Sequence, residues 1–287
     1  MPYEFKPIRL EDWDLFGGGA TAESFYHKTD PTLMLKLFNE GVERSSSERE
    51  YTASRSISDM GIRVPHALSL VQCGNRLGII YERIVGKKSI ARLCADDPEN
   101  IPTYAKMLAR EAKKLHATEC DQNIFQPRKK ILEKFLSEIH LSDFARERVI
   151  RVLSTMEPAT TCIHGDLQMG NIIYADGRCY WIDLADFAYG SPLIDLGVLY
   201  FNCQIMNNSP IIHDLLHMTG PQLDAFWKEF LPEYLETDSK TKLAEFEKKV
   251  RPYAALFVVM AIHTLGETKL PPDLNDKIFT TIFRDFE

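Results

Sequence analysis

The sequence predicts an α+β fold of two lobes: a small β-rich lobe that contains one helix, and a larger, mainly helical lobe. Up to about residue 86, short runs of strand-forming residues alternate with turns, and beyond it apolar residues recur at helical spacing. A chain of 287 residues is also long enough for two lobes that share a cleft. We therefore expect an N-terminal lobe at residues 1–86 and a C-terminal lobe at residues 87–287.

Four strands are expected in the first lobe, because each run of apolar and β-branched residues is bounded by turn residues: Ser24–His27, Leu33–Phe38, Ala67–Cys73 and Leu77–Glu82. Gly74 and Asn75 form a strong turn signal between the last two. One helix interrupts the strands. It is expected to begin in the cluster Ser45–Ser47, which offers N-caps, and to stop at Gly61.

The second lobe is expected to be helical around one β-rich island. Helical spacing of apolar residues covers Pro102–Thr118 and continues over Ile131–Leu153. Strands are expected within Thr160–Leu184, where Asp176 and Gly177 mark a turn between two apolar runs. From Asp195 onward the pattern returns to helix.

Composition excludes several classes of protein. Lys and Arg total 34 against 41 Asp and Glu, a net charge of −7, so no basic surface for nucleic acid is expected. The six cysteines form no CxxC pair, and the longest apolar run, Ala254–Ile262, is too short for a membrane span. The N-terminal residues show no secretory pattern. We expect a cytoplasmic protein without nucleic-acid or membrane partners; its oligomeric state stays open.

The island contains the residues that indicate chemistry, in the run His164-Gly-Asp-Leu-Gln-Met-Gly-Asn171 and the later Asp183. Asp166 follows a strand, in a loop from which its carboxylate can project. Asn171 begins the next strand, and Asp183 ends the return strand of the hairpin, which brings it back beside Asn171. One amide oxygen and one carboxylate suit Mg²⁺ that substrate phosphates complete, and a separate carboxylate suits a base for a hydroxyl proton.

This segment, continued by Ile182-Asp-Leu-Ala-Asp-Phe187 and by Asp195-Leu-Gly197, resembles the catalytic segment of the aminoglycoside phosphotransferase and choline kinase family, which has a protein-kinase-like fold. The resemblance implies that Asp166 is the catalytic base and that Asn171 and Asp183 bind the metal. It implies that Asp195 braces the catalytic loop through backbone hydrogen bonds, and that His164 orients this loop.

The resemblance also requires three features in the first lobe: a glycine-containing loop, a phosphate-binding lysine on a strand, and a helix glutamate that holds this lysine. Gly17, Gly18, Gly19 and Thr21 precede a strand, where small residues let backbone N–H groups approach phosphates. Lys36 lies between apolar residues of the strand Leu33–Phe38.

Helical periodicity selects the partner of this lysine. Glu50 shares one face with Ala53 and Ile57, so it lies on the apolar, inward side of the helix, whereas Glu48 lies on a solvated face. We expect Glu50 to pair with Lys36. The competing interpretation makes Glu50 the capping-box partner of Ser47, but Ser45 and Glu48 can form the expected box instead.

The lobes are expected to join after Tyr81. In the family the matching segment is the hinge that contacts the nucleotide base, which here implies Glu82 and Ile84, with Tyr81 behind the base. A bulky tyrosine there leaves the choice between ATP and GTP open.

The predicted function is a small-molecule kinase that uses Mg²⁺ and a nucleotide to phosphorylate a hydroxyl of an aminoglycoside, choline or another amino or sugar alcohol. Leu184 and Ala185 follow Asp183 where protein kinases have Phe-Gly, which favours a small acceptor. The alternatives are a protein-kinase-like enzyme, a nucleotide-binding sensor without turnover, and a metal-dependent hydrolase built on His164. Four aromatic residues could contact the substrate, although their helical spacing favours helix packing: Trp227, Phe230, Tyr234 and Tyr253. His213 and His217 are expected on one helix as a surface pair.

Overall fold

The computed structural model describes residues 3–18, 22–266 and 269–284. The chain divides into two compact units, called here the first and the second unit. The first unit contains residues 1–88 and 173–185, and the second contains residues 89–172 and 186–287. The domain boundary predicted after residue 86 stays a prediction.

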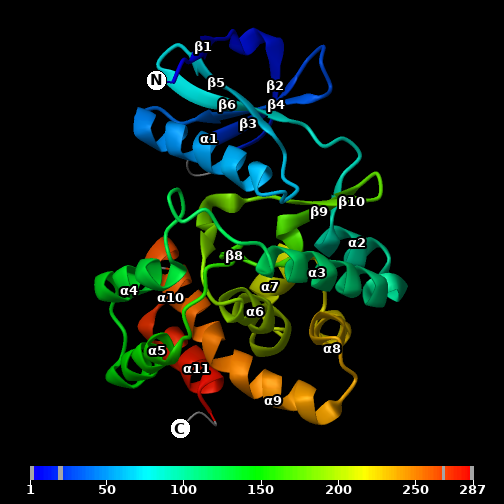
Figure 1. The fold of residues 1–287 in the computed structure, drawn as a ribbon, viewed down its shortest axis with the longest axis vertical. Helices are drawn as coiled ribbons and strands as arrows, with labels where there is room; N and C mark the ends of the chain where they lie inside the picture. The colour runs from blue at the N-terminus through cyan, green and yellow to red at the C-terminus, as the bar shows by residue number, and fades with distance from the viewer. Residues whose placement is uncertain (1–2, 19–21, 267–268, 285–287) are drawn as a thin grey trace. The chain divides into compact units, whose positions relative to one another are not determined.

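The first unit is built on a six-stranded sheet in the order β1-β5-β6-β4-β3-β2, shown in blue and cyan in Figure 1. β1 pairs with β5 in parallel, and the other strands pair antiparallel. The strands are β1 (Lys6–Pro7), β2 (Trp13–Gly18), β3 (Ala22–His27), β4 (Leu33–Phe38), β5 (Ala67–Cys73) and β6 (Arg76–Glu82).

Successive side chains of β4 point to opposite faces of the sheet. Leu35 and Leu37 are fully buried on one face, with Trp13 and Phe25. Lys36 points to the opposite face, because successive side chains of a strand alternate. On that face the helix α1 (Arg44–Asp59) covers the sheet and contributes Tyr51 to its apolar cluster.

The start of α1 differs from the prediction. The helix begins at Arg44, after the N-cap residue Glu43, whose side chain accepts no hydrogen bond from a backbone N–H of the first turn. The hydroxyl of Ser45 donates to the Glu43 carboxylate, and Glu48 pairs with Arg44 at 2.8 Å, so the expected capping box does not form. The predicted end is confirmed: Gly61 follows the last turn at φ +83° and donates its N–H to the carbonyl of Ser58.

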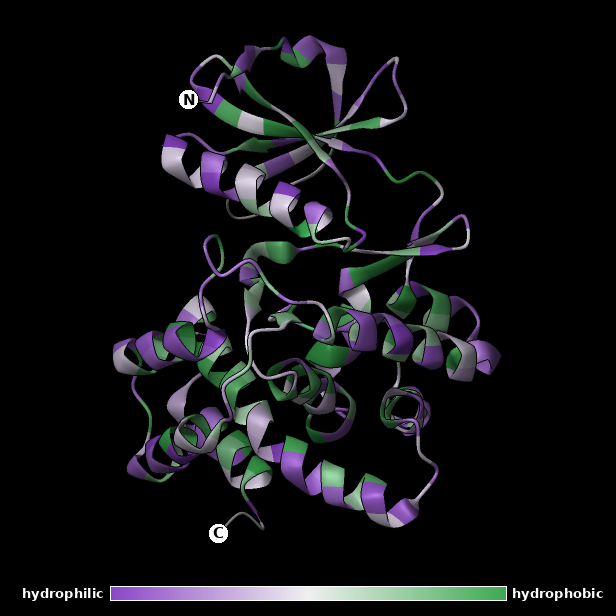
Figure 2. Cartoon of the chain, in the orientation of Figure 1, coloured by the Kyte–Doolittle hydropathy of each residue, from purple (hydrophilic) through white to green (hydrophobic). Residues whose placement is uncertain are grey.

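Most of α1 is purple or pale in Figure 2, and its only large buried apolar side chains are Tyr51 and Ile57. The apolar contact of α1 with the sheet therefore depends on few large side chains, Tyr51 among them.

A hairpin from late in the chain also belongs to the first unit. It consists of β9 (Ile172–Ala175) and β10 (Arg178–Trp181), joined by the predicted turn, in which Asp176 and Gly177 both have positive φ. Arg63 holds β10, because its carbonyl accepts the N–H of Trp181 at 2.9 Å and its Nε donates to the carbonyl of Cys179 at 3.1 Å.

The second unit is mainly helical. Its helices are α2 (Ile90–Asp96), α3 (Ile101–His116), α4 (Arg128–Glu138), α5 (Asp143–Thr155), α6 (Leu193–Tyr200), α7 (Pro210–Leu216), α8 (Gly220–Leu235), α9 (Lys240–Val250), α10 (Ala254–Leu265) and α11 (Pro272–Ile282). The strands β8 (Cys162–Ile163) and β11 (Ala188–Tyr189) pair antiparallel, and β7 (Lys88–Ser89) lies where the chain passes from one unit to the other. The apolar helix α10 belongs to a core cluster of the unit in which it packs with residues of α5 and α11.

Two helical predictions need correction in the second unit. The stretch Ile131–Leu153 is not continuous, because α4 ends at Glu138 and Ser142 caps a new helix by accepting the N–H of Ala145. His213 and His217 do not share a helix, since α7 ends at Leu216 and His217 has a left-handed backbone. Within the described part of the chain, no group of three His, Cys, Asp or Glu residues could hold a metal ion.

Candidate active site

An ion pair between Lys36 and Glu50 lies in the first unit. The ammonium of Lys36 donates to Oε1 of Glu50 at 2.7 Å and to Oε2 at 2.9 Å. Both side chains are about one third exposed, so the ion pair is only partly shielded from water. The pairing predicted from the periodicity of α1 is therefore confirmed, and its role at a nucleotide stays a prediction.

The hydroxyl of Tyr81 contacts the same carboxylate. It donates to Oε1 of Glu50 at 2.9 Å and lies 3.4 Å from the hydroxyl of Ser54. Burial, together with the negative charge of Glu50, raises the pKa of Tyr81 well above its ordinary value. Tyr81 therefore stays neutral and remains a hydrogen-bond donor to Glu50.

A cavity of about 420 Å³ in the first unit brings several predicted site residues together. Its lining includes Lys36, Glu50, Tyr81 and Asp183. Asp183 lies two residues beyond the end of the hairpin strand β10 and has a positive φ of 57°, an uncommon conformation for a residue other than glycine. One hollow thus holds an ammonium group and two carboxylates, a set suited to phosphates and a divalent cation.

Four other residues predicted to bind the nucleotide lie elsewhere in the first unit. Among the described residues, Gly17, Gly18, Glu82 and Ile84 do not line this cavity. Gly17 and Gly18 end the strand β2, and Gly19 and Thr21 lie outside the described residues.

The hinge residues pack into the first unit. The N–H of Glu82 donates to the carbonyl of His66 at 2.9 Å. Ile84 is buried in an apolar cluster with Ile173 and Ala175 of the hairpin. Contacts of Glu82 and Ile84 with a nucleotide base remain predictions.

The second unit carries Asp166 and Asn171. Asn171 lies in a short 3-10 turn, Met169–Asn171, and is 6% exposed. Its Nδ2 donates to the carbonyl of Asp166 at 3.0 Å and to the Asp166 carboxylate at 2.9 Å. The amide nitrogen therefore fixes the Asp166 side chain, which leaves Oδ1 as the atom of this amide that can coordinate a cation.

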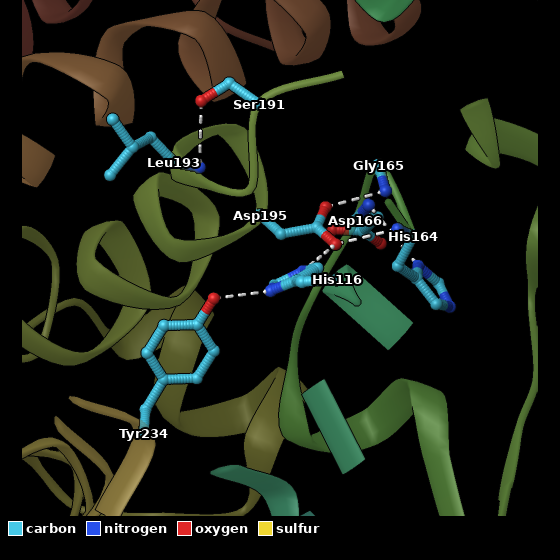
Figure 3. Close-up of polar contacts among 8 residues, drawn as sticks. All are labelled: His116, His164, Gly165, Asp166, Ser191, Leu193, Asp195 and Tyr234. Carbon is cyan, nitrogen blue, oxygen red and sulfur yellow. Dashed lines mark hydrogen bonds and ion pairs between the residues drawn. The ribbon is translucent and has the colours of Figure 1, made fainter. Parts of the chain in front are cut away.

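Asp195 supports the loop that contains Asp166. Figure 3 shows its carboxylate between the loop and His116. The N–H of His164 donates to Oδ2 at 2.7 Å, and the N–H of Gly165 donates to Oδ1 at 2.8 Å. This confirms the predicted hydrogen bonds from Asp195 to the loop backbone. His164, which is fully buried, in turn accepts the N–H of Asp166 at its Nδ1.

Asp195 remains ionised although it has no exposure to solvent. Burial alone raises the pKa of its carboxyl, but the hydrogen bond and charge of His116, with those of His164, outweigh this effect. The pKa of Asp195 consequently lies below its ordinary value. Asp195 lies in the first turn of α6. At the start of this helix, the hydroxyl of Ser191 accepts the N–H of Leu193 (Figure 3).

His116, which was not predicted from the sequence, completes this network. Its Nε2 lies 3.0 Å from Oδ2 of Asp195, and its Nδ1 lies 2.8 Å from the hydroxyl of Tyr234. A signal existed, since His116 continues the buried face of α3 four residues after Ala112. The hydroxyl of Tyr234 therefore has His116 as its hydrogen-bond partner. The other three aromatic residues are buried, which agrees with helix packing: Trp227, Phe230 and Tyr253.

Comparison with known proteins gives the family. A model of the phosphotransferase enzyme family (APH) matches residues 12–231, well over half of the chain. The chain belongs to this family. It is therefore a phosphotransferase with an alcohol group as acceptor, as predicted. A search of curated proteins gave no match.

Solved structures with this fold include several small-molecule kinases. A thermostable mutant of aminoglycoside phosphotransferase APH(4)-Ia, in a ternary complex with ADP and hygromycin B, has a TM-score of 0.64 at 11% identity, over 95% of this chain and 92% of that one. Amicoumacin kinase hAmiN, in complex with AMP-PNP, Ca²⁺ and Ami, has a TM-score of 0.60 at 18% identity, over 99% and 90%. A choline/ethanolamine kinase family protein from Mesorhizobium loti has a TM-score of 0.57 at 16% identity, over 94% and 87%. These likenesses confirm the predicted two-lobed, protein-kinase-like α+β fold of this family member.

Proposed function

We propose that this phosphotransferase transfers the γ-phosphoryl group of ATP or GTP to a hydroxyl group of a small molecule. The proposal is carried by one observation: the Lys36–Glu50 ion pair and the Asp183 carboxylate line the same cavity. Phosphoryl transfer depends mainly on positioning and on neutralising charge on the phosphates, and an ammonium held by a carboxylate suits that task.

Each unit contributes distinct groups to the proposed reaction. In the first unit, Lys36 binds the donor phosphates, and Glu50 orients its ammonium. In the second unit, Asp166 binds the acceptor hydroxyl and takes its proton as the oxygen attacks the γ-phosphorus. Asp195 and His164 support this role, because they hold the backbone on both sides of Gly165.

The donor set fits Mg²⁺, which prefers oxygen ligands and usually binds through one or two carboxylates together with phosphates. We propose Oδ1 of Asn171 and the carboxylate of Asp183 as its protein ligands. When bound, Mg²⁺ would neutralise part of the negative charge on the phosphates. A metal-dependent hydrolase on His164 is not supported, since the ring of His164 accepts the N–H of Asp166 inside the unit.

For the acceptor we propose a hydroxylated small molecule of the kind bound by the similar structures, such as an aminoglycoside or an amino alcohol. Leu184 and Ala185 after Asp183, in place of the Phe-Gly of protein kinases, support a small acceptor over a protein. We propose a cytoplasmic location for the reaction, in keeping with a chain in which no described helix is long and apolar enough to cross a membrane.

The test is a panel of acceptors incubated with the purified full-length chain, MgCl₂ and either ATP or GTP. Hygromycin B, gentamicin, choline and ethanolamine represent the small molecules, and casein represents protein substrates. We expect nucleotide consumption and a phosphorylated product with a small molecule, detected by mass spectrometry. Phosphorylated casein without small-molecule product would favour the protein-kinase alternative. Nucleotide binding without any product would favour the sensor.

A further inference from the structure

The guanidinium of Arg128 is buried in the second unit, although no step of the proposed reaction uses it. Arg128 is the first residue of α4 and is only 2% exposed. Its Nη1 donates to Oδ1 of Asp186 at 2.8 Å and lies 3.4 Å from the Asp186 carbonyl oxygen. Its Nη2 contacts the sulfur of Met260 and donates a long hydrogen bond of 3.4 Å to the carbonyl of Gly165.

Stability alone does not explain a buried charge of this kind. Only the Arg128 side of the ion pair is buried, since the Asp186 side chain is about one third exposed. Desolvating a charged group offsets much of what its pairing returns, so replacement of such a pair by apolar groups is often neutral. Among the described residues, the buried Nε of Arg128 also has no hydrogen-bond partner. Stability alone therefore does not explain why this residue is an arginine. The position of its contacts indicates a different role.

The contacts of Arg128 meet at the peptide group that precedes the proposed base. The carbonyl oxygen of Gly165 and the N–H of Asp166 belong to the same planar peptide group. Arg128 holds the oxygen of this group, and Nδ1 of His164 accepts its N–H at 3.3 Å. Both ends of the group are held, which restricts the direction in which the Asp166 side chain leaves the backbone.

Asp186 lies against the same loop. Gly165 has a φ of +84°, and a Cβ atom placed on it would overlap with the carbonyl oxygen of Asp186. The two backbone segments are therefore in direct contact at Gly165, and Arg128 donates to a carbonyl oxygen of each. Asp186 follows Asp183 by three residues, so Arg128 bridges the segment of the proposed base and the segment that follows the proposed metal ligand.

We propose that Arg128 is a positioning residue for phosphoryl transfer: together with Asp186 it fixes the Gly165–Asp166 peptide and thereby the direction of the Asp166 carboxylate. This inference rests on the proposed role of Asp166. Arg128 acts through the loop and touches neither donor nor acceptor. Its loss should lower kcat and leave the KM for both substrates nearly unchanged.

The experiment compares the wild type with Arg128→Met, Arg128→Lys and the double variant Arg128→Met/Asp186→Asn, all in the full chain with MgCl₂. Arg110→Met is the matched control, because Arg110 also pairs with a carboxylate of the second unit, Glu233 at 2.7 Å, but at the surface. For each protein we would measure kcat, both KM values, the Kd of AMP-PNP and the melting temperature. The acceptor is the molecule on which the wild type turns over in the panel above.

We expect Arg128→Met to lower kcat about tenfold or more, because a misdirected base loses much of the benefit of positioning. KM and the Kd of AMP-PNP should stay within about threefold of wild type, since the contacts to both substrates remain. Arg128→Lys should not restore kcat, because one ammonium cannot replace a guanidinium fork that reaches two segments. The double variant should lose no more than Arg128→Met alone, as expected when two residues act as one unit, and Arg110→Met should keep the wild-type kcat.

The inference is overturned if folded Arg128→Met, or Arg128→Lys where Arg128→Met does not fold, retains the wild-type kcat. A parallel loss of melting temperature, nucleotide affinity and kcat would also overturn it, because that pattern describes a purely structural residue. A wild-type chain that binds nucleotide but phosphorylates nothing in the panel overturns the proposed function, and the inference with it. An active wild type with an unaffected Arg128→Met overturns the inference alone.

Discussion

Tyr81 and Lys36 share one oxygen atom of Glu50 as their hydrogen-bond acceptor, at 2.9 Å and 2.7 Å. Glu50 is therefore held from two strands of the sheet, β6 through Tyr81 and β4 through Lys36. The carboxylate that fixes the ammonium is itself fixed by a neutral hydroxyl. The sequence predicted only that Tyr81 lies behind the nucleotide base; the structure shows that its hydroxyl orients Glu50.

Tyr81→Phe should weaken the use of nucleotide without abolishing it. The change removes one hydrogen bond to a charged group, so kcat/KM for the nucleotide should fall by about three- to tenfold. Tyr51→Phe is the control, since Tyr51 lies in the same apolar cluster and its hydroxyl does not contact Glu50. Initial rates at varied nucleotide concentration check the prediction, and equal values for the two variants would contradict it.

Glu50→Gln should impair transfer more strongly than Tyr81→Phe. Without the carboxylate, Lys36 loses its ion pair, and we expect kcat/KM for the nucleotide to fall about tenfold or more. Glu48→Gln on the same helix is the matched control, because Glu48 pairs with Arg44 instead. Steady-state kinetics of both variants provide the measurement, and a Glu50→Gln protein as active as Glu48→Gln would refute the role of this pair.

Asp195→Asn should destabilise the chain near neutral pH but less in acid. The pKa of Asp195 is lowered in the folded protein, so its contribution is present above the unfolded pKa of about 3.9 and is lost as pH falls through the lower folded pKa. Removing one partner of a buried charged network costs about 3 kcal/mol in free energy of unfolding. Urea unfolding at pH 7 and in steps below pH 4 tests this.

Asp224→Asn is the control for this pH dependence. The Asp224 carboxyl also has a lowered pKa, from its hydrogen bond to Lys228, but this pair is largely exposed. It should cost less than about 1 kcal/mol at pH 7. A difference between wild type and Asp195→Asn that stays constant from pH 7 down to acid would count against an ionised Asp195.

Gly165→Ala should inactivate the enzyme, because the new Cβ would overlap with the carbonyl oxygen of Asp186 and force the loop to move. Gly177→Ala is the matched control: Gly177 has a similar φ of +77°, but no atom lies within 4 Å of the position of its Cβ. The control should cost only about 1 kcal/mol of stability and leave kcat unchanged. Activity assays and thermal melts of both variants distinguish steric contact from backbone strain.

The strands of the first unit could be predicted closely, because local alternation determines them. The expected bounds of Leu33–Phe38 and Ala67–Cys73 match β4 and β5. The strand β2 was missed, since its two terminal glycines look like a loop rather than a strand. Membership of the hairpin β9–β10 in the first unit was not anticipated either, because it depends on hydrogen bonds to Arg63, more than one hundred residues earlier.

The Lys36–Glu50 pair could be predicted because helical periodicity distinguishes Glu50 from Glu48. The partners of Arg128 could not, since they lie at Gly165, Asp186 and Met260, and no local pattern marks an arginine as buried. The break between α4 and α5 was missed although Ser142 is a typical N-cap, because apolar spacing continues across it.

The decisive measurement is single-turnover phosphoryl transfer by Asp166→Ala, with the Kd of AMP-PNP measured on the same preparation. If Asp166 binds the hydroxyl and accepts its proton, transfer to the acceptor should fall by about a thousandfold or more. The Kd should stay within about twofold of wild type, because Lys36, Glu50 and Asp183 are intact. A folded Asp166→Ala protein that phosphorylates the acceptor at the wild-type rate would contradict the assignment of Asp166 as the base.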